Sequence, residues 1–589
     1  MRSYTFGVIV SALAVGGVTA QTVGGRTHQD LVRLYEEFRA FTIPELNGGV
    51  PDYTPPAMTR KREGLRELQQ RLATLDTTGW SMAERVDYLV VKAEMSGMEF
   101  DHRVLRPWTR DPAFYVVINF QFGPKMYGAT GLPSLPIAPD RVEAVRQRLR
   151  AIPAILAQAQ QNLTEPGADL AMLGIRSKNR EEGLLGSFVD SLRRHHPALV
   201  PQADSALAAV RGFRDWLQQI RPTLRARAGI GANNYTWFMR NVMLLPYSWE
   251  ELNTIAQRDL DRSLALMTME EHRNRALPPF DLIDTPEEYR ERHVDAQRAL
   301  LDFLRREGVM TVPDFIQVQP PGGFQTTRPL DYFQNVNYRD PLALLPHDFL
   351  VHTPDAQRRS LDTRPIRGAR RLYFVDGQRQ DGLATAMEQI LMNLGSLDGR
   401  PRAKELAHNL FALRAVRALS DLKMHGNELS IMEAFQFNID NTPKGWLPEN
   451  SSTMWHDLEL YLRQPGYGVG YLIGLAQIEQ LMAERAKQLG PAFSMKQFMD
   501  DFVNAGLIPI SLVRWELTGT SAAVVAARPP RERPAMIPCP WPTTAVKAAE
   551  PEVSGNQRPR IPDCTPPGWQ PPAELAPYEP RPLPADRPK

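Results

Sequence analysis

Long amphipathic runs dominate the pattern of hydrophobic and polar positions along most of the chain. In residues 287–308 and 473–490, apolar side chains recur every three or four positions, the spacing that predicts a helix with one buried face. The second run ends at Gly490, a residue type that commonly stops a helix. Thr285 followed by Pro286 predicts a helix start. Four further starts are predicted by a capping box, in which a serine precedes Glu or Gln by three residues: Ser81, Ser248, Ser430 and Ser494.

Signals for β-strands are few. Pro112–Phe120 and Arg370–Asp376 are the best candidates, because they are rich in aromatic and β-branched residues that partly alternate with other types. No repeat of fixed period and no alternation of strands with helices is present, which argues against a Rossmann fold or a TIM barrel. We therefore expect a mainly α fold, with residues 21–526 forming one large helical domain that contains a small β element.

The first twenty residues have the pattern of a secretion signal. Arg2 is followed by the apolar run Phe6–Val18, and small residues at 18–20 fit a cleavage site before Gln21. No cysteine stands at that site, so no lipid anchor is expected, and no later apolar stretch is long enough for a membrane span. The mature protein is expected to be periplasmic or secreted.

Composition narrows the classes of partner. The formal net charge is +2 over 589 residues, and no long basic block is present, so nucleic acid is not an expected partner. The two cysteines, Cys539 and Cys564, lie near the C-terminus and are either paired across a short loop or both free. The preceding domain thus offers neither a disulfide nor a thiolate ligand.

Proline is concentrated at the C-terminus, where residues 529–588 hold 18 of the 51 prolines. Such a segment favours extended conformations and forms no packed core. Residues 527–589 are therefore predicted to be a mostly disordered tail. The tail is either an arm that binds a partner or tethers the protein to the cell wall, or simply a solvated extension.

The stretch PHDFLVH, residues 346–352, is close to the zinc-peptidase pattern H-E-x-x-H. His347 and His352 are five residues apart, not four, and the acid after the first histidine is Asp348. On an α-helix this spacing turns the two histidines roughly 140° apart, so only a distorted segment could direct both at one ion. Pro346 and Pro354 flank the stretch and could cause such a distortion. The alternative is two unrelated histidines near a loop.

Two other stretches hold acidic or charged residues at helical spacing. Asp381 and Glu388 are seven residues apart, two turns along one helical face, and could supply a metal ligand and its supporting carboxylate. Asp381 beside Gly382 also fits a helix N-cap. A continuous polar stripe follows, formed by Arg414, Arg417, Asp421 and His425. The stripe either forms buried ion pairs, Arg417 with Asp421 and Asp421 with His425, or lines a substrate cleft.

The glycine-rich stretch YLRQPGYGVGYLIG, residues 461–474, is not a phosphate loop, because no Lys-Ser/Thr follows it. Its glycines allow close backbone approach near a helix start. Tyr467 and Tyr471 are four apart, so both hydroxyls could point into a cleft, where a tyrosine can stabilise an oxyanion. Ordinary core packing is the alternative.

The order of these stretches resembles the bacterial family known as domain of unknown function 885, whose members look like helical zinc metallopeptidases with a substrate cleft. That family has H-E-x-x-P-G-H-H, then E-G-W-A-x-Y-x-E, an R-A-x-R…D…H helix and P-G-Q-A-x-x-Y-x-x-G. Here DGLATAME, RAVRALSDLKMH and PGYGVGYLIG stand in the places of the last three, and the resemblance extends from about Leu31 to Gly519. Of the first motif only His347 carries over unchanged, and Asp348 stands in the place of its glutamate base. In the second motif, Asp381 stands in the place of the glutamate expected as the third ligand.

The resemblance implies one of two functions. In the first, the metal centre has degenerated and the protein is a pseudoenzyme that binds peptides or partner proteins in its cleft, with the tail as a further contact. In the second, it is an active zinc-dependent peptidase with an irregular site. The resemblance implies His347, His352 and either Asp381 or Glu388 as zinc ligands. It implies Asp348 as the base and Tyr471 as the donor to the oxyanion. A metal-independent enzyme that uses the stripe, with His425 catalytic, is the remaining alternative.

Overall fold

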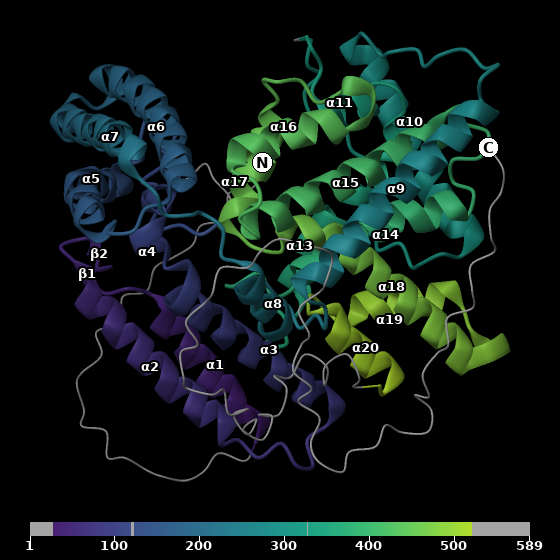
Figure 1. Ribbon diagram of the computed structural model, residues 1–589, viewed down its shortest axis with the longest axis horizontal. Helices are drawn as coiled ribbons and strands as arrows, with labels where there is room; N and C mark the ends of the chain where they lie inside the picture. The colour runs from purple at the N-terminus through teal and green to yellow at the C-terminus, as the bar shows by residue number, and fades with distance from the viewer. Residues whose placement is uncertain (1–26, 119–122, 327, 521–589) are drawn as a thin grey trace, which may run out of the picture. The chain divides into compact units, whose positions relative to one another are not determined.

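The computed structural model describes residues 27–118, 123–326 and 328–520, shown in Figure 1 as an arrangement of helices with one small sheet. The expected mainly α fold with a small β element is confirmed. The predicted secretion signal, the proline-rich tail and both cysteines lie outside the described residues. Among the described helices, none combines the length and the apolar character needed to cross a bilayer.

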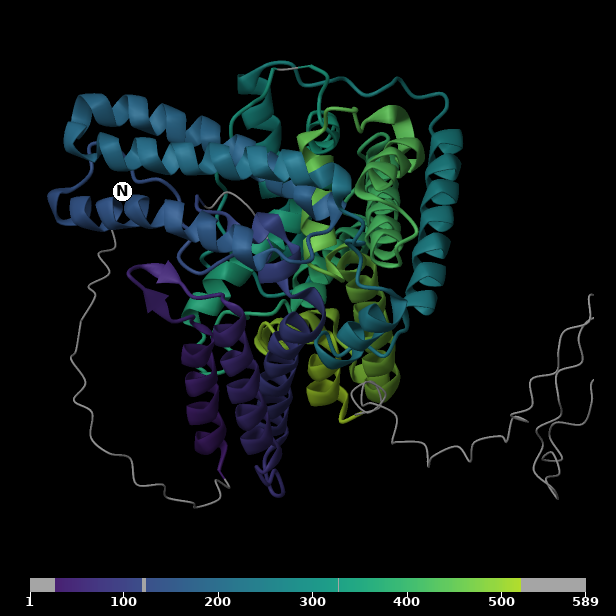
Figure 2. The same ribbon diagram turned by 60° about the vertical axis from the view of Figure 1, so that its left-hand side comes forward.

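Three N-terminal helices pack side by side, and Figures 1 and 2 show them together in purple. A two-stranded antiparallel hairpin joins the first two and turns at Gly48 and Gly49, which both have positive φ angles. The elements are α1 (His28–Thr42), β1 (Leu46–Asn47), β2 (Val50–Pro51), α2 (Pro55–Ala73) and α3 (Met82–Phe100).

A second group of three long helices has a hydrophobic core of its own. Figure 2 shows these helices running across the direction of α1–α3. The short helix α4 (Pro107–Arg110) leads into the group, which consists of α5 (Val142–Asn162), α6 (Ala168–His195) and α7 (Val200–Ile220).

The remaining helices include α15, in which almost every side chain is buried. Helices α9 and α18 pack against α15, and α14 packs along α18. The elements are α8 (Ala232–Asn241), α9 (Trp249–Arg273), α10 (Pro286–Glu307), α11 (Tyr332–Asn337), α12 (Leu345–His347), α13 (Thr353–Leu361), α14 (Gly377–Asn393), α15 (Ala403–His425), α16 (Ile431–Asn441), α17 (Ser452–Arg463), α18 (Tyr467–Leu489), α19 (Met495–Asn504) and α20 (Ile510–Thr518).

The predicted helix boundaries agree closely with the structure. Ser81, Ser248 and Ser430 each form a complete capping box. The Ser494 hydroxyl accepts a hydrogen bond from the Gln497 amide, but the reciprocal bond of a capping box is not formed. Thr285 caps α10, and Gly490 ends α18 as predicted.

Both predicted strands are wrong in the described residues. Residues 112–115 form a 3₁₀ turn, and only Ile118 makes a single bridge with another segment. The side chains of residues 114–118 are all buried, so this apolar run fills a core and does not belong to a sheet. Residues 370–376 form no strand, and Phe374 among them has a φ angle of 46°, in the left-handed region that no strand uses.

Candidate metal centre

A π-helical turn, Asp348–His352, lies between α12 and α13 and brings the two histidines together. The Thr353 amide donates to the Asp348 carbonyl five residues back, so the turn holds one residue more than an α-helical turn. Side chains five apart then share a face, and the rings of His347 and His352 lie 4.9 Å apart between centroids. This is the distortion that the five-residue spacing requires.

Pro354 supplies a physical reason for the wider turn. In a continuous α-helix the ring of Pro354 would clash with the carbonyl of Leu350, four residues earlier, and no amide would satisfy that carbonyl. Proline is tolerated at the second position of α13, where Pro354 lies, because an amide there has no partner within the helix.

His347, His352 and Asp381 form a cluster that fits a metal ion. Each offers one ligand atom, and the three atoms lie within 4.8 Å of one another. His352 Nε2 and Asp381 Oδ1 are 3.6 Å apart, close to the roughly 3.3 Å that separates two ligands of a tetrahedral zinc ion. Two imidazoles and a carboxylate are a donor set that zinc commonly takes. The fit therefore requires side-chain rotations that bring the most widely separated ligand atoms, at most 4.8 Å apart, inward by up to about 1.5 Å.

Glu388 supports the cluster from behind and is not part of it. Its Oε1 lies 3.0 Å from His347 Nδ1, and its two oxygens pair with the guanidinium of Arg414 at 2.5 and 2.6 Å. A hydrogen bond from Nδ1 to Glu388 leaves Nε2 of His347 as the nitrogen that can bind a metal. Burial lowers the pKa of His347, so the ring is neutral near pH 7 and able to act as a ligand.

The acidic residues of the predicted site have different surroundings. Asp381 is 3% exposed and lies in the first half of α14, whose N-cap is Asp376, so the alternative of Asp381 as a helix cap is wrong. Asp348 is exposed and is not one of the three clustered ligands. The structure therefore brings His347, His352, Asp381 and Glu388 together and leaves Asp348 on the solvent side.

Two glycines let α14 and α18 approach closely enough to complete the site. A Cβ on Gly474 would lie 2.1 Å from the Gln378 carbonyl oxygen, and one on Gly382 would lie 2.4 Å from the Cα of Gly474. No larger residue fits at either position without separating the helices. The contact brings Asp381, next to Gly382, close to Tyr471, one turn before Gly474.

Tyr471 and Arg417 form one wall beside the histidines. The ring of Tyr471 stacks 6.3 Å from that of His347, and the Arg417 guanidinium lies 4.8 Å from the centre of the Tyr471 ring. Burial raises the pKa of Tyr471, so its hydroxyl stays protonated and can donate a hydrogen bond. Tyr467 is half-buried and stacks on Phe374 at 4.7 Å, which gives it a packing role beside the site.

The C-terminal half of the polar stripe stabilises the fold. Asp421 accepts a hydrogen bond from the Gly468 amide at 2.9 Å and so caps the N-terminus of α18. His425 Nε2 lies 2.9 Å from the Tyr461 carbonyl. The predicted proximity of Asp421 and His425 is confirmed at 3.6 Å. The predicted pairing of Arg417 with Asp421 is wrong: Arg417 donates to Asp457, a residue of α17, at 2.6 Å.

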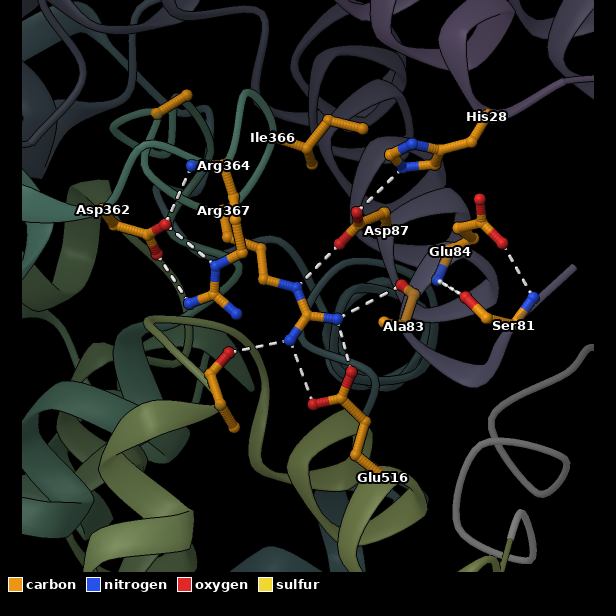
Figure 3. Close-up of polar contacts among 12 residues, drawn as sticks. His28, Ser81, Ala83, Glu84, Asp87, Asp362, Arg364, Ile366, Arg367 and Glu516 are labelled. Carbon is orange, nitrogen blue, oxygen red and sulfur yellow. Dashed lines mark hydrogen bonds and ion pairs between the residues drawn. The ribbon is translucent and has the colours of Figure 1, made fainter.

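The segment 362–376 connects the histidine-bearing turn to α14 and is held by buried charges. Figure 3 shows Arg367 at its centre, donating to Asp87 of α3 at 2.8 Å and to Glu516 of α20 at 3.0 Å. Asp87 also lies 3.0 Å from Nε2 of His28 in α1. Arg367 is only 3% exposed, so this network fixes the segment against both ends of the described chain.

Sequence reasoning did not identify Arg367, Asp457 or Tyr461. The partners of Arg367 lie more than a hundred residues away, and no local pattern marks them. Asp457 and Tyr461 are four apart on α17, so a helical face with an acid and a phenol was visible in the sequence. Its proximity to Arg417 depends on the tertiary fold alone.

Comparisons with known proteins give the following results. The family model described as bacterial protein of unknown function (DUF885) matches residues 40–306 and 363–517, well over half of the chain. The gap between the two matched parts contains His347 and His352. Among curated proteins nothing matches.

Two solved structures share the fold. One is described as a lipoprotein of unknown function from Shewanella oneidensis, with a TM-score of 0.63 and 15% identity over 83% of this chain and 97% of that one. The other is described as a lipoprotein from Colwellia psychrerythraea, with a TM-score of 0.60 and 15% identity over 84% of this chain and 99% of that one. At this identity the likeness concerns the fold alone.

Proposed function

The chain belongs to the bacterial family of unknown function DUF885, and from this premise we propose that it is an exported zinc-dependent peptidase. The observation that supports this most is the π-helical turn, which places His347 and His352 on one face beside Asp381. A turn of this kind costs regular hydrogen bonding, and π-helical turns are frequent at functional sites. Export is inferred from the N-terminal signal pattern.

His347, His352 and Asp381 would hold the zinc ion. When bound, zinc lowers the pKa of a coordinated water and polarises a substrate carbonyl. Glu388, fixed by Arg414, orients His347 and sets which of its nitrogens faces the metal.

Asp348 and Tyr471 supply the remaining chemistry. Asp348 follows His347 directly and its exposed carboxylate can take a proton from water on the open side of the site. The buried, protonated Tyr471 donates a hydrogen bond to the oxyanion that forms from the peptide carbonyl. Arg417, 3.5 Å from the Tyr471 hydroxyl, favours negative charge at the same place.

A second candidate function is peptide binding without catalysis. Asp348 stands outside the ligand cluster, and its side chain is one carbon shorter than that of glutamate. The family match is also interrupted over residues 307–362, which include the histidine turn. Such a pseudoenzyme would bind a peptide beside the histidine cluster without hydrolysing it.

The two candidates are separated by assaying peptide hydrolysis in the zinc-loaded protein and in Asp348→Asn. The peptidase hypothesis predicts cleavage in the wild type, and a loss of at least about 100-fold in the variant, the usual contribution of a general base. Asp314→Asn, at an exposed position remote in sequence, is the matched control and should cleave normally. Peptide binding without cleavage in zinc-loaded wild type would favour the pseudoenzyme.

A further inference from the structure

Arg417 is a buried cation whose hydrogen-bonding capacity is only partly used. The residue is 7% exposed. Its Nη2 donates to Asp457 at 2.6 Å and approaches the Tyr471 hydroxyl at 3.5 Å. Its Nε is buried and has no partner. A buried guanidinium donor without an acceptor is costly, so its presence calls for an explanation.

A second unused donor lies beside it. The Tyr461 hydroxyl is buried without a partner, and the Arg417 guanidinium lies 5.5 Å from the centre of the Tyr461 ring. Burial raises the pKa of both Tyr461 and Tyr471, so both phenols are protonated and can donate. Two buried donors without partners, Arg417 Nε and the Tyr461 hydroxyl, thus belong to side chains in contact, and Arg417 donates to one carboxylate, that of Asp457. This arrangement suits an incoming anion.

The place lies one helical turn from the metal centre. Arg417 follows Arg414 by three residues on α15, and Nη2 of Arg414 lies 3.2 Å from Nδ1 of His347. The ring of Tyr471 spans the interval, in contact with Arg417 on one side and stacked near His347 on the other. One extended peptide residue covers about 3.5 Å. The carboxylate of the residue that follows a scissile bond would therefore reach this region.

The balance of charge agrees with an anionic ligand. Two guanidiniums, Arg414 and Arg417, face three carboxylates, Asp381, Glu388 and Asp457. A divalent ion on the histidine cluster turns this excess of negative charge into one net positive charge. A single carboxylate would neutralise that charge.

We propose that Arg417, together with Tyr461, binds the C-terminal carboxylate of a peptide. The protein would then act on the last peptide bond of its substrate, an inference that rests on the proposed peptidase function. Hydrolysis breaks the peptide C–N bond that joins the last residue to the one before it. Water gives hydroxide to the carbonyl carbon and a proton to the leaving amine of the last residue. The products are a shortened peptide and one free amino acid.

Binding is tested first, in zinc-loaded protein with probes that cannot be hydrolysed. The probes are N-acetyl-Ala-Phe in which a CH2 group replaces the alanine carbonyl, once with a free C-terminal carboxylate and once as the C-terminal amide, titrated by calorimetry. The wild type should bind the acid at least about tenfold more tightly than the amide, the effect of one charge-assisted pair. Arg417→Met should reduce this preference to less than about twofold.

Two further variants guard against an effect of misfolding. Tyr461→Phe removes only the unpaired hydroxyl, so it should fold normally and still lose part of the preference for the acid. Arg176→Met is the matched control, because Arg176 also stacks on an aromatic ring and also has a buried Nε without a partner, but lies on α6. The control should keep the full preference.

The outcomes separate this inference from the peptidase proposal. Equal binding of acid and amide by the wild type, or a preference that survives in both Arg417→Met and Tyr461→Phe, would overturn the carboxylate site. A preference lost in these variants, with no cleavage by the zinc-loaded protein, would support the site and refute the peptidase. Cleavage of the Ala–Phe bond of N-acetyl-Ala-Phe at equal rates in the acid and in its amide would support the peptidase and refute the site.

Discussion

Replacing Gly474 by alanine tests whether the contact between α14 and α18 sets the geometry of the metal centre. The new Cβ would lie 2.1 Å from the Gln378 carbonyl oxygen and 2.5 Å from the Cα of Gly382, whereas ordinary contacts begin at 3.4 Å. Both obstructing atoms belong to the backbone, so no side chain can turn away. The helices must separate by about 1 Å, the typical result of overpacking, at a cost of about 1–3 kcal/mol.

The displacement should weaken metal binding as well as the fold. Asp381 is carried by α14, and a shift of about 1 Å takes its carboxylate out of reach of a bond of about 2 Å to zinc. We expect zinc affinity, measured by competition with a chromophoric chelator, to fall at least about tenfold. The melting temperature should fall in the same variant.

Gly183→Ala is the matched control, because Gly183 lies within α6 and a Cβ there meets nothing within 4 Å. This change should stabilise the protein by about 0.5–1 kcal/mol through helix propensity and leave zinc affinity unchanged. If Gly474→Ala bound zinc like the wild type and melted no lower than Gly183→Ala, the glycine contact would not control the site.

Three further predictions concern buried charges. Arg367→Met should reduce the free energy of unfolding by about 3–5 kcal/mol, because two carboxylates lose their ion pairs with Arg367. A loss under about 1 kcal/mol in urea denaturation would contradict the network. Glu388→Gln should weaken zinc binding about 10–100-fold by releasing His347, and an unchanged affinity in chelator competition would refute this role. His425→Gln should make stability fall, relative to the wild type, as pH rises from about 4 to 7, with urea denaturation of both proteins measured at intervals of pH. Burial raises the pKa of Asp421 to about 7 and lowers that of His425 to about 4. In the wild type this pair binds one proton in each state between about pH 4 and 7: on Asp421 when folded and on His425 when unfolded. The pair therefore makes no net contribution to the change of stability with pH in this range. In the variant only the acid remains, and the folded state binds the extra proton. A stability difference between the variant and the wild type that did not widen as pH rose would contradict the assignment.

Local chemistry explains why helix boundaries were predictable and the strands were not. A serine hydroxyl that caps an amide three residues on is decided within one turn, so Ser81, Ser248 and Ser430 behave as predicted. The aromatic run at residues 112–120 is equally compatible with a strand and with core packing. Within the described residues no strand lies beside this run, and that depends on the tertiary fold and is not encoded locally.

The candidate site was predictable in its members more than in its geometry. The sequence spacing identified His347, His352 and Asp381. The need for a distorted segment followed from the rotation of about 100° per residue in an α-helix, which turns histidines five apart away from each other. The partner of Arg417 could not be derived in this way, because Asp421 was its only acidic neighbour at helical spacing. Packing of α17 against α15 supplied Asp457 instead.

The most direct test of a working metal centre is the zinc content of the mature protein, purified without chelators or a histidine tag, in wild type, His352→Ala and His195→Ala. His352 has 31% of its side chain exposed, so its loss should leave the fold intact, and His195 is an exposed histidine remote from the cluster in sequence. We expect about one zinc per chain in the wild type and in His195→Ala, and almost none in His352→Ala at an unchanged melting temperature. A wild type without zinc, or zinc that persists in His352→Ala, would contradict the site.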